Sequence, residues 1–96
     1  MTISFTNTLK TWKDGAGWHY VRLPKDCYKD LKEIGSSGKR GLGAVKVKCF
    51  IGNTEWETSV FPDSEDKSHI LFIKKAVRTA ENITAGDRVK GVVEVI

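Results

Sequence analysis

The stretch VKVKCFIGNTEWETSVF, residues 45–61, decides the fold. Apolar and polar side chains alternate on both sides of Gly52-Asn53, and this dipeptide is typical of a two-residue hairpin turn. A register with Ile51 opposite Thr54 puts the apolar residues of both arms on one face. The other opposed residues are then Cys49 and Trp56, Val47 and Thr58, and Val45 and Val60. A slip of one residue would turn these side chains to the other face, so the stretch predicts a hairpin of fixed register.

The opposite face of the predicted hairpin carries charges. Lys48 lies opposite Glu57 in this register, and Lys46 lies opposite Ser59. Opposite charges that face each other across two strands stabilise their pairing. One register therefore predicts both a buried apolar face and a Lys48–Glu57 charge pair.

The rest of the chain predicts four more strands and two short helices. Pro24, followed by apolar residues at helical spacing, predicts the start of the first helix, and Gly35 predicts its end. Gly91 lies on the apolar face of the last strand and predicts a bulge or a crowded contact. The expected strands cover residues 3–9, 18–23, 69–73 and 88–96, and the expected helices cover residues 25–34 and 74–81.

The order of these elements repeats along the chain. Residues 3–51 and 54–96 each give strand, strand, helix, strand. Each half has one apolar face, which it can bury against the other half. We therefore expect a mainly β domain with two short helices, spanning residues 1–96 as one six-stranded barrel of two pseudo-symmetric halves. Both halves lie in one chain, so a monomer suffices; chance periodicity in a small β-rich chain is the alternative.

Length and composition agree with one small globular domain. The 96 residues contain 40 % hydrophobic and 29 % charged residues, with 16 Lys and Arg against 12 Asp and Glu, a formal charge of +4. No apolar run is long enough to span a membrane. The first residues, MTISFT, lack the basic and apolar regions of a signal peptide, so we expect a cytoplasmic protein.

The cysteines and histidines predict neither a metal site nor a cofactor. Cys27, Cys49, His19 and His69 are far apart in the sequence, and no Cys-x-x-Cys or His-x3-His spacing occurs. A zinc site of all four is the less favoured interpretation. We expect two reduced, mostly buried thiols.

Five motifs in order carry a family resemblance. They are WHYVRLPKD at 18–26, GLGAVKV at 41–47, WETSVFP at 56–62, KKAVR at 74–78, and Gly86-Asp87. With these five motifs, the chain resembles a bacterial and archaeal family of domains of unknown function that are about as long as this chain. The resemblance implies a double-split β-barrel, a fold group that includes AbrB/MazE-type transcription factors and antitoxins. Some relatives are fused to a bacteriocin-protection-type (OmpD-associated) domain. The resemblance implies a fold and no activity.

The second predicted helix carries the candidate binding site. Lys74 and Lys75 stand at its N-terminus, against the helix dipole, and Arg78 adds a cation one turn later. Glu81 offers partial compensation to Arg78 at i,i+3. Cations beside unpaired N–H groups favour a phosphate or carboxylate, so we expect an anionic ligand here.

The acidic loop before the second helix and the basic loop after the first helix both concern this site. The alternative is that both lysines extend into solvent or pair with Asp63, Glu65 or Asp66 in the preceding loop. Lys39 and Arg40, in the loop after the first helix, could add a second basic contact.

The tryptophans have two interpretations. Trp12 and Trp18 flank a glycine-rich turn and could stack on a base or a sugar. They could instead pair across two strands and stabilise that turn. Trp56, opposite Cys49, is assigned to the core.

These residues favour a non-catalytic binding module for an anionic small molecule or protein group. A nucleic-acid-binding protein of AbrB/MazE-like fold is the alternative, supported by the basic charge but weakened by the interspersed acids. An enzyme comes third, because Ser59 has no acid–histidine partner at a recognisable spacing.

Overall fold

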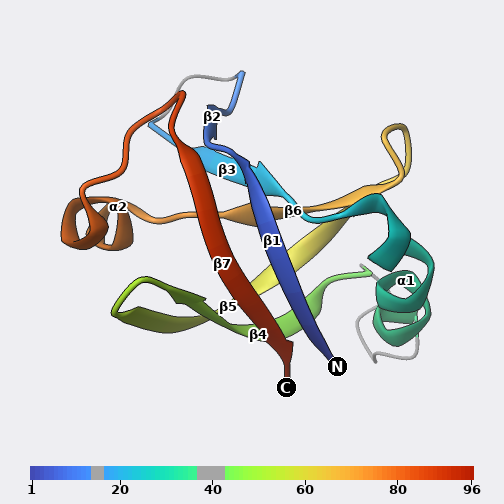
Figure 1. The fold of residues 1–96 in the computed structure, drawn as a ribbon. Coiled ribbons are helices and arrows are strands. Elements are labelled where there is room, and N and C mark those ends of the chain that lie inside the picture. Colours follow the sequence, from blue (N-terminus) through green and yellow to red (C-terminus); the bar gives the residue numbers. More distant parts are fainter. Residues whose placement is uncertain (14–16, 37–42) are drawn as a thin grey trace.

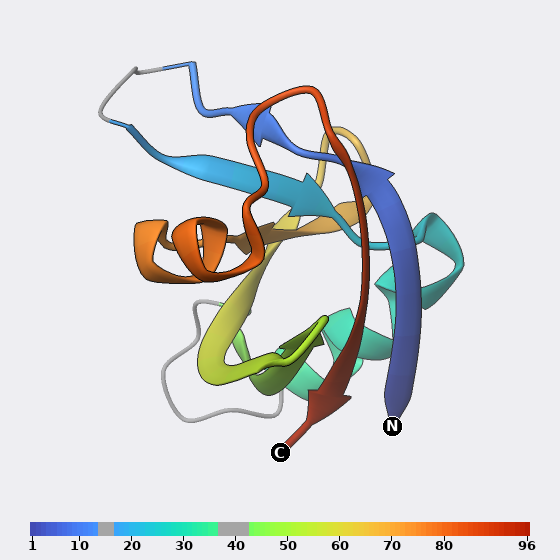
Figure 2. The ribbon, with the colours of Figure 1, turned by 60° about the vertical axis from the view of Figure 1, so that its left-hand side comes forward.

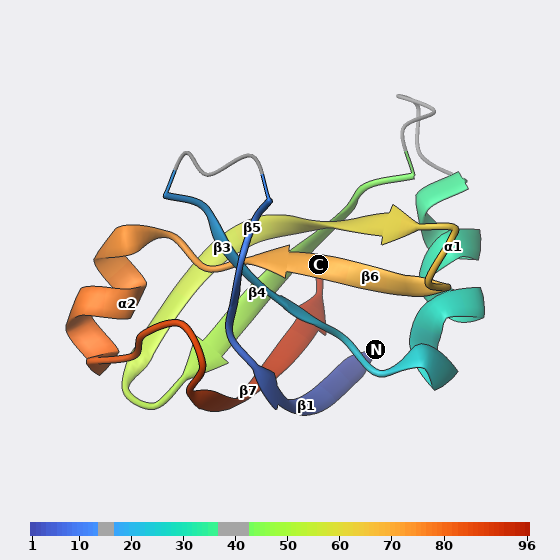
Figure 3. The same cartoon turned by 90° about the horizontal axis from the view of Figure 1, so that it is seen from above.

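A computed structural model describes residues 1–13, 17–36 and 43–96 (Figure 1). The chain is mainly β, with a short 3-10 turn and two α-helices. In order, the elements are β1 (Thr2–Thr8), β2 (Lys10–Thr11), β3 (His19–Arg22), η1 (Lys25–Cys27), α1 (Tyr28–Ser36), β4 (Val45–Ile51), β5 (Thr54–Asp63), β6 (Ser68–Phe72), α2 (Lys75–Glu81) and β7 (Arg88–Val95). The two α-helices lie at opposite ends of the sheet, α1 beside the β5–β6 turn and α2 beyond the end of β6 (Figures 1 and 3).

The strands form one antiparallel, barrel-like sheet in the order β1-β7-β4-β5-β6-β3-β2. Figure 2 shows the sheet curling until β1 approaches β3. No ladder joins these two strands; the side-chain amide of Asn7 donates to the carbonyl of Arg22 at 3.1 Å. The barrel is therefore nearly closed, and a side chain bridges its seam.

The β4–β5 hairpin has the register that the sequence predicted. Ile51 pairs with Thr54, Cys49 with Trp56, Val47 with Thr58 and Val45 with Val60. On the outer face Lys48 does stand opposite Glu57, but the predicted charge pair between them is wrong. The ion pairs run diagonally instead, from Lys48 to Glu55 at 3.3 Å and from Lys46 to Glu57 at 4.0 Å. Long lysine side chains on a twisted sheet reach the diagonal neighbour as readily as the opposed residue.

The sheet has seven strands, where the sequence predicted six. The additional strand, β2, contains only two residues and pairs with the start of β3. β1 pairs with β7 as far as Thr8. After the buried Leu9, the chain pairs with β3 instead, as β2. A segment this short has no alternation of its own, so the sequence could not separate it from the turn that follows.

The first helix also differs from its predicted limits. It begins as a 3-10 turn and continues as α1 to Ser36, through the predicted stop at Gly35. Gly35 is buried, and a Cβ there would collide with the backbone of Gly43. This glycine permits close packing inside the helix instead of ending it. Neither helix, over the residues that the structure covers, is long and apolar enough to cross a membrane.

The core fills the inside of the barrel. Its buried apolar side chains come from the inward face of the curled sheet and from segments between its strands, and each α-helix adds one of them. The largest fully buried apolar members are Leu9, Val21, Leu23, Leu31, Val47, Val60, Leu71, Ile73, Val77, Val89 and Val93. Leu31 belongs to α1 and Val77 to α2, so each helix is held to the barrel by an inward apolar residue.

Gly91 makes the crowded contact that the sequence predicted. The β1–β7 register runs through it without a bulge, with Phe5 directly opposite. An ideal Cβ at this position would lie 2.7 Å from Cζ of Phe5 and 2.7 Å from the backbone oxygen of Phe50. The absence of a side chain lets β1 and β4 pack around β7.

Gly91→Ala should destabilise the protein by about 1–3 kcal/mol, because the added methyl group must displace a ring and a backbone carbonyl. Urea denaturation of the wild type and the variant measures this difference. Lys90→Ala, at the exposed neighbouring position, is the control and should change the stability little. Equal stabilities of Gly91→Ala and the wild type would contradict the contact.

Candidate functional site

A surface cleft of about 350 Å³ opens beside α2. Its walls come from residues 17–19 before and at the start of β3, residues 56–58 of β5, the end of β6, and the first turn of α2. Figure 3 shows α2 at the end of the barrel where β3 begins and β6 finishes. Segments far apart in the sequence thus meet around one concave surface.

The cleft brings together the three cations predicted on the second helix. Lys74, Lys75 and Arg78 all line it. Lys74 is the N-cap of α2, and both lysines are exposed. Within residues 1–13, 17–36 and 43–96 neither lysine forms an ion pair.

Arg78 is half-buried and has a positioning role. Its Nε donates to the carbonyl of Ile73 at 3.1 Å, and its Nη2 donates to the carbonyl of Gly17 at 3.2 Å. The guanidinium therefore ties α2 to the segment that precedes β3. This leaves the arginine as a fixed positive charge at the wall of the cleft.

Glu81 does not compensate Arg78, so this prediction is wrong. Its carboxylate accepts a hydrogen bond from Oγ1 of Thr54 at 2.6 Å. Glu81 also fills the space beside Gly52 in the β4–β5 turn, where a Cβ would collide with it. The carboxylate therefore fixes the end of α2 to the hairpin, and the position of the helix follows from the hairpin turn.

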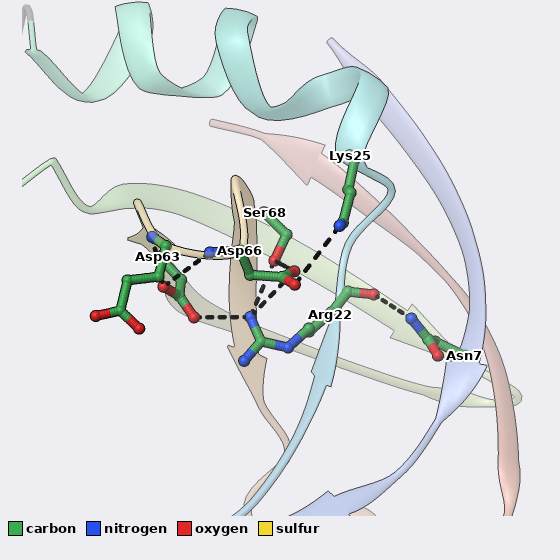
Figure 4. Close-up of polar contacts among 7 residues, drawn as sticks. Asn7, Arg22, Lys25, Asp63, Asp66 and Ser68 are labelled. Atoms are coloured by element: carbon green, nitrogen blue, oxygen red, sulfur yellow. Dashed lines mark hydrogen bonds and ion pairs between the residues drawn. The ribbon is translucent and has the colours of Figure 1, made fainter.

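The acidic loop after β5 is engaged elsewhere (Figure 4). Nη1 of Arg22 donates to Asp63 at 2.9 Å and to Oγ of Ser68 at 3.0 Å. Lys25 lies 3.6 Å from Asp66, which accepts a hydrogen bond from Ser68 at 2.6 Å. The hydrogen bond from Arg22 lowers the pKa of Asp63, and the one from Ser68 lowers the pKa of Asp66. These two acids therefore pair with β3 and η1, and not with Lys74 or Lys75.

Aromatic rings continue the cleft onto the outer surface of the sheet. Phe72 is their centre, in edge-on contact with Trp18 at 5.1 Å, Trp12 at 5.4 Å and Phe61 at 6.2 Å between ring centroids. Tyr20 packs on Trp12 at 5.4 Å. We call this group the aromatic face; its members are Trp12, Trp18, Tyr20, Phe61 and Phe72.

The structure bears on both interpretations of Trp12 and Trp18, pairing across two strands and an exposed ring that could stack on a ligand. The backbone N–H of Trp12 donates to the carbonyl of Trp18 at 2.8 Å, which extends the β2–β3 ladder. Their rings meet Phe72 instead of each other, and 56 % of Trp18 remains exposed. Trp56 is buried in the core as predicted.

Sequence reasoning missed Tyr20, Phe61 and Phe72 as parts of this surface. Each is next to a fully buried residue of its strand. Tyr20 precedes Val21, Phe61 follows Val60, and Phe72 follows Leu71. Strict alternation in the predicted strands would have placed all three rings outward. Lys39 and Arg40, predicted as a second basic contact, lie outside the described residues.

The two cysteine thiols both have a raised pKa. Burial raises the pKa of the Cys49 thiol to about 12. Burial and a hydrogen bond to Asp26 raise the pKa of Cys27. A thiol with a raised pKa is a weak nucleophile near neutral pH. Among residues 1–13, 17–36 and 43–96, no three His, Cys, Asp or Glu side chains gather as metal ligands.

The fold and the cleft define a small, mainly β domain with a cationic and aromatic surface site. The chain matches, over residues 5–93, the model of a family described as a domain of unknown function, DUF1905, and it belongs to this family. This confirms the expected resemblance to a family of uncharacterised domains. The chain matches no curated protein.

The side-chain nitrogen and oxygen atoms that the described residues bury without a hydrogen bond are the two ring nitrogens of His69. His69 lies on β6 against the ring of Tyr28, is 1 % exposed, and neither ring nitrogen has a partner. Burial disfavours its charged form and lowers its pKa. The folded protein therefore holds this histidine neutral.

The lowered pKa of His69 predicts a loss of stability in mild acid. The unfolded chain binds a proton at His69 more readily than the folded protein, so stability falls as the pH drops below the unfolded value of about 6.5. We expect His69→Leu to be about 1–3 kcal/mol more stable than the wild type near pH 5, since it removes a buried polar ring without partners. Urea denaturation at about pH 5 and pH 7 measures both effects.

The other histidine supplies the control for this prediction. His19 is half-exposed, and its Nδ1 is 2.8 Å from the carbonyl of Gly17. His19→Gln should retain the fall in stability that the wild type shows. A wild type and a His69→Leu variant with the same dependence on pH would contradict the assignment to His69.

Proposed function

We propose that this domain is a non-catalytic binding module whose cleft beside α2 takes an anionic group of a small molecule or of a protein. One observation carries the proposal: Lys74, Lys75 and Arg78 line the same cleft as Trp18 and Phe72. Its volume of about 350 Å³ lies in the lower part of the range of ligand pockets. A polar wall and an apolar wall that face one space suit a ligand with a charged and an apolar part.

The side chains, and not the helix dipole, supply the attraction. α2 has only seven residues, so its dipole adds little to three cationic side chains. Glu57 is the acid that lines the cleft, and Lys46 lies 4.0 Å from its carboxylate. The cleft therefore has an excess of positive charge over its described lining.

For the fold we propose the finer arrangement implied by the resemblance, a double-split barrel of two related halves, residues 3–51 and 54–96. The element order supports it, because β1, β3, α1 and β4 of the first half correspond to β5, β6, α2 and β7 of the second. Exchanging these partners maps the β1–β7, β7–β4, β4–β5 and β6–β3 pairings onto pairings of the same sheet, while the β5–β6 pairing maps onto the boundary between β1 and β3. Both halves lie in one chain, so a monomer would suffice, with the single domain spanning residues 1–96. From the resemblance we also propose bacterial or archaeal relatives, some fused to the bacteriocin-protection-type domain.

Binding of phosphate, sulfate or a nucleoside monophosphate should raise the melting temperature of the wild type. A ligand at about 100 times its Kd adds about 2.7 kcal/mol of stability, which corresponds to a rise of several degrees in a domain of this size. In Lys74→Ala/Lys75→Ala we expect less than half of this rise. Arg78 is left in place, because its guanidinium also holds the carbonyls of Ile73 and Gly17.

The matched control removes two cations elsewhere. Arg88 and Lys90 are exposed on β7, so Arg88→Ala/Lys90→Ala has the same formal charge as the cleft variant. Its melting temperature should respond to the anions as the wild type does. The same anion-dependent rise in the cleft variant and in the wild type would reject the cleft as the binding site.

A further inference from the structure

We propose that the aromatic face and the cleft together bind a single-stranded nucleic acid. Its bases would stack on Trp18 and Phe61, and its phosphates would lie beside Lys74 and Lys75. This inference rests on the anion-binding cleft of the proposed function, but it puts a nucleic-acid backbone phosphate there in place of a group from a small molecule or a protein.

The rings on the strands lie on the outer side of the sheet. Val21, Leu71 and Val60 are fully buried on three adjacent strands, so the alternate residues face outward. Tyr20 stands directly opposite Phe72 in the β3–β6 register. Tyr20, Phe61 and Phe72 of the aromatic face are therefore carried by strands whose inner side is packed into the core, which fixes their positions.

Two rings of the aromatic face are exposed. Trp18 is 56 % exposed and Phe61 is 41 % exposed; Trp18 contacts Phe72 from just before β3, and Phe61 contacts it from β5. Trp18 meets Phe72 at an interplanar angle of 87°, so the two rings do not cover each other's flat faces as stacked rings would. Proteins that bind single-stranded nucleic acids stack unpaired bases on exposed aromatic rings of this kind. Every base has a flat face, so such stacking does not depend on the base sequence.

Exposed lysines lie around the rings. Lys10 stands opposite Tyr20 in the β2–β3 register, and Lys13 follows Trp12. Both are exposed, as are Lys74 and Lys75 beyond the end of β6. Among the described residues none of these four lysines forms an ion pair. Lysines thus flank the aromatic face on the β2 side and on the α2 side.

This combination favours a single strand over other polyanions. A duplex stacks its bases on one another and offers only their edges, so it could use the lysines but not the rings. An acidic peptide or a polyphosphate would likewise leave the rings without a role. A single strand supplies both phosphates and free base faces.

Fluorescence anisotropy with labelled single strands of about ten nucleotides, DNA and RNA, tests the proposal. The wild type should bind at least one of them with a Kd of about 1–100 µM at low salt and bind a duplex of the same length at least about tenfold more weakly. Trp18→Ala/Phe61→Ala should weaken binding about tenfold or more, whereas Trp18→Phe, which keeps a ring, should stay close to the wild type. Both sites are exposed, and a melting curve of each variant confirms folding.

Two controls match these variants. Phe50 is an outward, half-buried ring at the far end of the β4–β5 hairpin, so Phe50→Ala should leave the affinity unchanged. Lys74→Ala/Lys75→Ala should weaken binding more than Arg88→Ala/Lys90→Ala, which removes the same charge from β7.

Several results would overturn the inference. They are equal affinities for duplex and single strand, an unchanged affinity in Trp18→Ala/Phe61→Ala, or displacement of the oligonucleotide by inorganic polyphosphate as effectively as by unlabelled strand. A mononucleotide that binds as tightly as the longer strand would also overturn it. A wild type that shows the anion-dependent rise in melting temperature yet binds no single strand rejects this inference and leaves the proposed function standing.

Discussion

The register of β4 against β5 is the constraint on which the rest of the structure depends. It turns Val47, Cys49 and Val60 into the barrel. β7 pairs with β4, and β6 pairs with β5. The hairpin register therefore decides which residues of β6 and β7 face inward and which face outward. A slip of one residue would bury Phe61 and expose Val60, and with that the core and the aromatic face would be lost together. One register therefore fixes both the stability and the outer surface.

The hairpin register could be predicted because neighbouring residues decide it, through alternation on both sides of a two-residue turn. A glycine on the apolar face of the last strand indicated the crowded contact at Gly91, but not its partners, Phe5 and Phe50. The features that were missed depend on partners far away in the chain. Gly35 continues α1 because it packs against Gly43, and Glu81 turns to Thr54 instead of Arg78. No local pattern records such contacts.

The seam of the barrel shows why β2 matters for the site. If β1 is matched with β5 and β3 with β6, the β5–β6 ladder corresponds to the boundary between β1 and β3. No ladder forms at that boundary; Asn7 bridges it, and the chain continues into β2, which pairs with β3. The continuation of the chain into β2 carries Trp12 onto Phe72. In the proposed arrangement of two halves, the aromatic face is thus built where the halves differ.

Part of the basic charge behind the formal +4 is paired in place. Arg22 and Lys25 are engaged by Asp63 and Asp66, and the hairpin lysines by Glu55 and Glu57. Surface pairs of this kind add little stability, but they cancel charge at those places. Lys10, Lys13, Lys74 and Lys75, around the aromatic face, have no ion pair within the described residues, and the same holds for Arg88 and Lys90 on β7. Exposed rings such as Trp18 contribute less to stability than buried ones, and their position among the lysines around the aromatic face is what the proposed binding role requires.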